Sequence, residues 1–219
     1  MAIILHLETA TKTCSVALSI DSKLIDVLEI HSDQFIHGEK LTLFIEEILT
    51  KNSISINRLS AVSISSGPGS YTGLRIGVAA AKGLCYAKNI PLIAVDTLHA
   101  FENCARKSYP NQTICVMLDA RRMEVYSSIF DTNSVQIKSL SADILDENSY
   151  QEFEPFVCIG DGGTKIIELW KDRNILIDEI LHISASGQID LAYGKFLAKD
   201  YVDLAYFEPN YLKEFYSGK

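Results

Sequence analysis

Positive charge is scarce in this chain. Its 219 residues include 20 Lys and Arg against 28 Asp and Glu, which gives a formal net charge of −8. A protein that holds nucleic acid by itself needs a basic stripe to neutralise phosphates, but the sequence offers only short basic pairs such as Arg121-Arg122. We therefore expect that any RNA would be held mainly through a partner.

Long apolar runs and paired cysteines are scarce too. No run approaches the ~20 residues needed to span a bilayer. The first apolar segment stops at Glu8 and has no basic stretch before it, which predicts a first strand and not a signal peptide. The five cysteines form no Cys-x-x-Cys pair, as is typical of reduced thiols in the cytosol. We expect a cytoplasmic protein without membrane contact.

Motifs for catalysis and metal binding are missing as well. No two of the five histidines stand four residues apart, and His-Glu-x-x-His does not occur, so the sequence predicts no metal site. The absence of Gly-x-Ser-x-Gly argues against a serine hydrolase. No residue is therefore nominated as catalytic.

What the chain does contain is a regular alternation of strand and helix patterns. Strands are predicted at 2–7, 14–20, 23–30, 59–64, 91–95, 113–118, 124–130, 135–140 and 156–159, and helices at 38–50, 71–87, 97–107, 164–170 and 186–199. Three strands followed by alternating helices and strands indicate a mixed sheet flanked by helices. Because the order recurs in weakened form, we predict an α/β protein of two related halves with a boundary near 108–112.

The most informative stretch runs from Ser65 to Gly77, between a predicted strand and a predicted helix. Its glycines let another backbone come close, and the N–H groups at the helix start could bind an anion or a partner. The helix continues with small residues up to Gly83. These suit either tight packing on its own sheet or a subunit interface.

Four segments carry a family resemblance: Leu7–Thr11 with Cys14–Leu18, Gly67–Gly77, Leu118–Arg122 with Glu124–Tyr126, and Glu208–Leu212. Together they resemble the TsaB (YeaZ) family of the actin-like, Hsp70 and sugar-kinase superfamily. The match is dense up to about Phe130 and thinner beyond it. The resemblance implies two actin-like subdomains, residues 1–108 and a reduced subdomain of residues 109–219. The last helix would pack back on the first subdomain.

The same resemblance implies a function in tRNA modification. The chain would be a non-catalytic scaffold or activator that pairs with the catalytic paralogue TsaD and the ATPase TsaE. That system transfers a threonylcarbamoyl group to N6 of the adenosine beside the anticodon. The tRNA would be met only through the complex, and the chain alone would form a homodimer. ATP and a divalent metal would belong to the partner subunits, with no cofactor on this chain.

Site residues follow from the resemblance as three groups. The partner-binding helices would contribute Leu41, Ile45, Ser70, Tyr71, Leu74, Arg75, Val78 and Ala81. A vestigial nucleotide site would comprise Glu8, Thr9, Thr11, Gly160, Asp161 and Gly162. A polar edge of the cleft between the halves would comprise Asp119, Arg121, Arg122 and Glu124.

Simpler interpretations stay open for each group. Glu8 is either a hydrogen-bonded residue at a strand end or a magnesium ligand, and the glycine expected after it is replaced by Ala10. The segments 160–165 and 119–124 could be ordinary turns. The alternative function is an active ATP-binding small-molecule kinase or ATPase, which requires a carboxylate–magnesium–phosphate site. A peptidase is not supported by any catalytic constellation in the sequence. The paralogue's metal site is also missing, because Thr97 and Phe101 occupy the positions of its two histidines.

Overall fold

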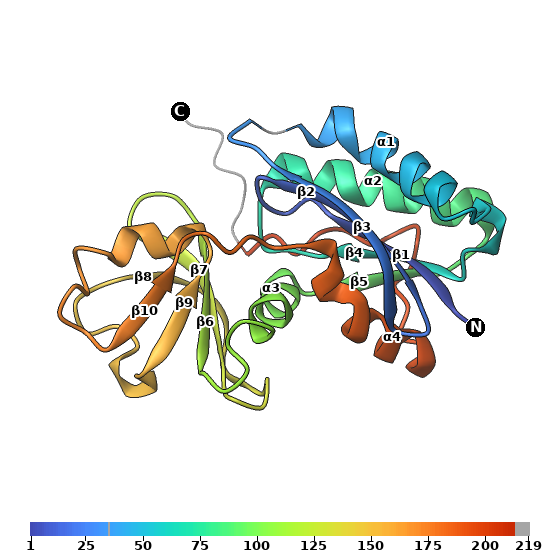
Figure 1. The fold of residues 1–219 in the computed structure, drawn as a ribbon. Helices are drawn as coiled ribbons and strands as arrows, with labels where there is room; N and C mark the ends of the chain where they lie inside the picture. The colour runs from blue at the N-terminus through green and yellow to red at the C-terminus, as the bar shows by residue number, and fades with distance from the viewer. Residues whose placement is uncertain (35, 213–219) are drawn as a thin grey trace.

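A computed structural model describes residues 1–34 and 36–212 as two α/β lobes lying side by side (Figure 1). The first lobe holds β1 (Ile3–Glu8), β2 (Thr13–Ile20), β3 (Lys23–His31), α1 (His37–Lys51), η1 (Ile56–Arg58), β4 (Ala61–Ser65), α2 (Tyr71–Lys88), β5 (Leu92–Val95) and α3 (Thr97–Arg106). Then follow β6 (Ile114–Asp119), β7 (Glu124–Phe130), β8 (Gln136–Ile144), η2 (Gln151–Phe153), β9 (Phe156–Ile159), η3 (Asp161–Ile166), β10 (Ile175–Asp178), η4 (Ala185–Gln188) and α4 (Ile189–Ala198).

The two sheets have the same topology. Their strand orders are β3-β2-β1-β4-β5 and β8-β7-β6-β9-β10. In each sheet the first three strands of the lobe are antiparallel, and the last two run parallel to the first. This repeat confirms the prediction of two related halves, and the fold is of the two-subdomain actin-like kind. The second lobe keeps all five strands but carries the short turns η2 and η3 in place of long helices, so its reduction is in the helices.

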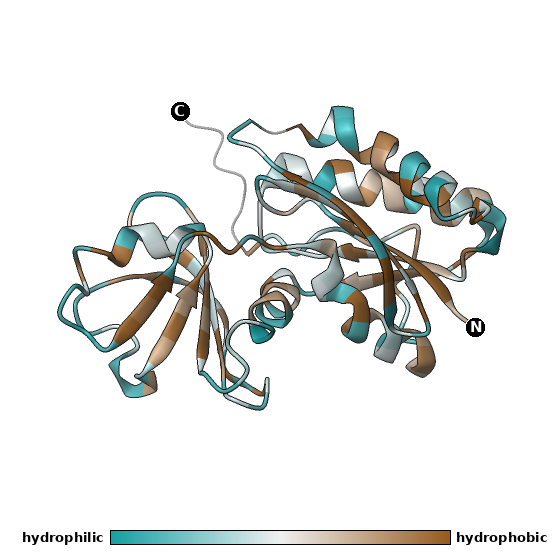
Figure 2. Ribbon diagram, viewed as in Figure 1, coloured by the Kyte–Doolittle hydropathy of each residue, from teal (hydrophilic) through white to brown (hydrophobic). Residues whose placement is uncertain are grey.

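The helices of the first lobe follow their sequence signals. In α1 the buried side chains are His37, Leu41, Ile45, Ile48 and Leu49, which form one apolar stripe on the sheet. Helix α2 begins after Ser70, whose hydroxyl accepts a hydrogen bond from the N–H of Gly73, and ends at the left-handed Asn89. Figures 1 and 2 show α1 and α2 covering one face of the sheet with their polar sides outward.

Helix α3 lies between the two sheets and joins their cores (Figure 1). A single apolar cluster combines Ile93 and Val95 of β5, Phe101 of α3, and Val116 and Leu118 of β6. Helix α4 packs against β5 of the first lobe, as Ala192 belongs to the same cluster. The boundary at 108–112 itself remains a prediction.

The sequence prediction was wrong in two places. Residues 164–170 do not form a regular helix; the chain makes the short η3 and then turns, with one bond from the N–H of Trp170 to the carbonyl of Ile166. So short a helix gains few internal bonds, and burying both Ile166 and Trp170 decides the path instead. The edge strand β10 was missed, because four residues ending in Asp178 give too short a pattern. Among residues 1–34 and 36–212, no helix is long and apolar enough to cross a membrane.

Candidate functional site

The glycine-rich turn packs against the loop between β1 and β2. The N–H of Ser70 donates to the carbonyl of Ala10 at 2.6 Å. A Cβ added at Gly69 would overlap Ala10, and one added at Gly73 or Gly77 would overlap Thr9. The glycines therefore make room for the chain's own loop.

Glu8 lies at the end of β1 and is completely buried. Its carboxyl group accepts hydrogen bonds from the N–H of Ala10 at 2.6 Å and from the hydroxyl of Ser65. Burial in this apolar surrounding, only partly offset by those bonds, raises the pKa of Glu8 from its ordinary 4.5 to about 7. Magnesium usually keeps several waters and takes exposed carboxylates. The geometry of Glu8, with both oxygens engaged and no opening to solvent, does not fit a magnesium–nucleotide site.

Gln188 of η4 links the ends of β1 and β4. Its side-chain N–H groups donate to the carbonyl of Leu7 at 2.7 Å and to the hydroxyl of Ser65 at 3.1 Å. Its carbonyl accepts from Ser63 at 2.7 Å. Since the hydroxyl proton of Ser63 goes to Gln188, the Nδ1 of His6 must donate to Ser63, at 2.7 Å.

The other ring nitrogen of His6 lies 2.8 Å from the hydroxyl of Ser19 and then accepts its proton. Burial lowers the pKa of His6 to about 3, so the ring is neutral. The network is thus complete without any ligand. It locks η4 across β1 and β4.

The pKa of Glu8 gives a stability prediction. A carboxyl whose folded pKa is raised contributes stability that is full below pH 4.5 and lost as pH rises through 7. Relative to Glu8→Gln, the wild type should lose on the order of 3 kcal/mol of unfolding free energy across this window. Urea unfolding at pH 5 and pH 8 measures the difference. Parallel pH profiles for the two proteins would mean that solvent or a cation reaches Glu8.

A pocket of about 200 Å³ lies between the lobes. Thr11 and Lys12 line it from the first lobe, and Gly160 and Asp161 line it from the second, above an apolar floor that includes Phe101. The structure therefore brings together Thr11, Gly160 and Asp161 of the predicted nucleotide site. The volume of this pocket is smaller than the ~300–1,000 Å³ typical of ligand pockets.

The remaining predicted nucleotide-site residues lie outside this pocket. Glu8 and Thr9 are completely buried in the first lobe. Gly162 is buried, with Met117 and Val125 next to the position of a Cβ. The predicted site is thus split between a small pocket and two buried regions.

The predicted polar edge is the hairpin between β6 and β7. Arg121 and Arg122 are exposed and have positive φ angles of 71° and 50°. Asp119 pairs with the ammonium of Lys165 at 2.6 Å, and its N–H donates to Asp161 of the pocket at 2.9 Å. That ammonium also donates to the carbonyl of Glu124 at 2.6 Å. Asp119 is thus bonded directly to a pocket residue, and Glu124 is joined to Asp119 through Lys165. A role of the four residues in binding stays a prediction.

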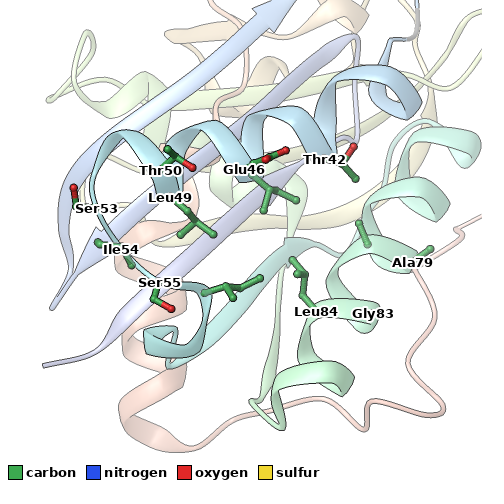
Figure 3. A pocket seen from close by; sticks show the side chains of 13 residues that line it. Thr42, Glu46, Leu49, Thr50, Ser53, Ile54, Ser55, Ala79, Gly83 and Leu84 are labelled. Atoms are coloured by element: carbon green, nitrogen blue, oxygen red, sulfur yellow. The ribbon is translucent and has the colours of Figure 1, made fainter.

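An apolar groove of about 700 Å³ lies between α1 and α2 (Figure 3). Figure 3 shows Thr42, Glu46 and Leu49 of α1 facing Gly83 and Leu84 of α2. The groove is open on the α2 side, because Ala79, Ala80 and Gly83 present almost no side chain there. We call this hollow the α1–α2 groove.

The eight residues predicted to bind a partner fall into three places. Leu41, Leu74, Val78 and Ala81 are buried in the first lobe's own core or against its loop. Ile45 lines the α1–α2 groove, although it is only 7% exposed. Ser70, Tyr71 and Arg75 lie at the start of α2, outside the groove. A partner on this helix pair would therefore meet mainly other residues of α1 and α2.

Sequence reasoning missed Gln188 and its partners. The available signal was a polar residue inside an apolar strand, as at His6 in β1 and Ser63 in β4. Gln188 is 125 residues from Ser63, and no local pattern marks so distant a contact.

Comparison with known proteins identifies relatives over most of the length. A family model described as "TsaD: tRNA N6-adenosine threonylcarbamoyltransferase" matches residues 32–207. The "tRNA threonylcarbamoyladenosine biosynthesis protein TsaB" of Escherichia coli is 29% identical over 219 residues, which cover 96% of this chain and 94% of the relative. A "tRNA N6-adenosine threonylcarbamoyltransferase" of Geobacillus thermodenitrificans is 37% identical over 81 residues, 37% of this chain and 22% of the relative. The structure of YeaZ from Pseudomonas aeruginosa has the same fold, with a TM-score of 0.85 at 23% identity, covering 97% of this chain and 100% of that one.

Proposed function

Because the chain belongs to the TsaB (YeaZ) family, we propose that it serves tRNA threonylcarbamoyladenosine formation as a non-catalytic subunit. In this proposal its α1–α2 groove docks on the catalytic paralogue TsaD. TsaE and the tRNA then act on the assembled complex, and without TsaD a second copy of the chain occupies the groove.

The observation that carries the proposal is the contrast between the two candidate regions. Around Glu8 the glycines, the β1–β2 loop and Gln188 fill the space with the chain's own atoms. The α1–α2 groove, by contrast, is open and apolar over about 700 Å³. Exposed apolar hollows of this kind are typical of protein interfaces.

The acidic charge agrees with an indirect role toward RNA. With a net charge of −8 the chain has little to offer phosphates. An active kinase or ATPase is the weaker candidate, because the buried Glu8 cannot be reached by a hydrated metal and the pocket between the lobes is about 200 Å³.

Reconstitution tests the proposal directly. Threonylcarbamoyladenosine formation on tRNA is measured with TsaD and TsaE, in the presence and absence of this chain. We expect modification to depend on the chain, and we expect the purified chain alone to show no ATP hydrolysis. Full modification without it, or ATP turnover by the chain alone, would contradict the proposed function.

A further inference from the structure

The residues that follow α4 form an extended segment, 199–212, that returns across the first lobe. We call it the strap. The N–H of Val202 donates to the carbonyl of Leu92 in β5 at 3.1 Å. Val202, Leu204 and Phe207 pack against the apolar core beneath α1 and α2. The strap is therefore part of the first lobe's structure.

Helix α2 holds the strap through two charged side chains. The ammonium of Lys82 donates to the carbonyls of Ala205 at 3.0 Å and Phe207 at 3.1 Å. The middle of the strap is thereby fixed to α2.

Arg75 holds the C-terminal end of the strap. Its Nε donates to the hydroxyl of Tyr211 at 3.2 Å, and its guanidinium lies 3.9 Å from the ring centre of Tyr71. The rings of Tyr71 and Tyr211 are 5.0 Å apart between centres. We call these three residues the latch.

The strap also contacts the glycine-rich turn. The N–H of Asn210 donates to the carbonyl of Ser66 at 2.6 Å. Gly67 has a φ of +103°, and a Cβ there would lie 2.7 Å from the carbonyl oxygen of Asn210. Only glycine suits that backbone angle and that proximity. One residue of the sequence signature is thus explained by the chain's own strap.

The two flanks of α2 consequently have different neighbours. Ala79, Ala80 and Gly83 line the α1–α2 groove, while Arg75 and Lys82 hold the strap. We propose that the strap is a positioning element: the latch keeps α2 where the groove fits its partner, and releasing the strap weakens docking without unfolding the lobe. The docking half of this inference rests on the proposed function.

Hydrogen exchange on the isolated full-length chain tests the positioning half. Tyr211→Ala should speed amide exchange about tenfold in the strap and the first turns of α2, since a cation–π contact, a ring pair and a hydrogen bond are lost together. Tyr211→Phe, which keeps the ring, should give a smaller change. Tyr206→Ala, at a strap side chain that is 85% exposed, is the control. Unchanged exchange in α2 after Tyr211→Ala would overturn the proposal.

Binding to TsaD tests the docking half. Tyr211→Ala should weaken the affinity, by at most the factor by which it speeds exchange, because the apparent affinity falls with the fraction of chains that hold α2 in the docking position. Tyr206→Ala should leave the affinity unchanged. If exchange shows that Tyr211→Ala frees the strap while the affinity for TsaD stays unchanged, the strap has no positioning role. If the wild type itself fails to bind TsaD, the proposed function and the docking half fail together, whereas the exchange data still decide whether the strap holds α2.

Discussion

Replacing Gly73 by alanine is expected to destabilise the chain by about 2–3 kcal/mol, the cost of overpacking a rigid site. The same glycine-to-alanine substitution at an ordinary helix position stabilises a protein by roughly 0.5–1 kcal/mol. The sign reverses here because the new methyl group would overlap the main-chain carbonyl of Thr9. Thr9 is itself completely buried and cannot move away cheaply.

Urea unfolding measures this effect, and α2 supplies its own matched control. Gly83 lies in the same helix, and nothing lies within 4 Å of a Cβ placed on it. Gly83→Ala should therefore stabilise by roughly 0.5–1 kcal/mol. If both variants gained stability, the packing of the β1–β2 loop against the glycine-rich turn would be wrong.

The second large effect is expected in partner binding. Gly83→Arg places a long charged side chain in the α1–α2 groove, where the floor is made of small residues. The monomer should stay folded, since the site of the new Cβ is open. Affinity for TsaD should fall about 100-fold or more, as when a central interface position is blocked, and tRNA modification should fall with it.

Tyr86→Arg is the control for this experiment. Tyr86 lies in the same helix, is 84% exposed and does not line the groove. It adds the same charge at a distance of less than one helical turn along the sequence. Equal losses for both variants would point to a charge effect, and undiminished binding by Gly83→Arg would exclude the groove as the docking face.

The strand and helix patterns predicted most of this fold. Strands such as β1 and β2 were found because they are runs of mostly apolar residues between clear turn signals, as buried strands usually are. Helix α1 was found from its apolar periodicity, and α2 from the glycine-rich turn that precedes it. The segment 161–178 was misread, because its path depends on contacts with β6 and β9 and not on local preference.

The candidate site was harder to predict for a related reason. The family resemblance named Leu41 and Leu74 as partner contacts, but both side chains are buried within the first lobe. The side of α2 that lines the groove has a weaker sequence signal, because it is marked only by small residues such as Ala79, Ala80 and Gly83. The eight residues named from the sequence remain a prediction about the helix pair, and the open groove now directs the tests to this flank.

The shared core around α3 has a consequence for motion. Proteins that open and close a cleft around a ligand need lobes that can separate at little cost. Here Val95, Phe101 and Leu118 belong to one continuous apolar cluster, so swinging the lobes apart would expose them to water. We expect the two lobes to keep their relative position when a partner binds, so that the molecule moves as one rigid body.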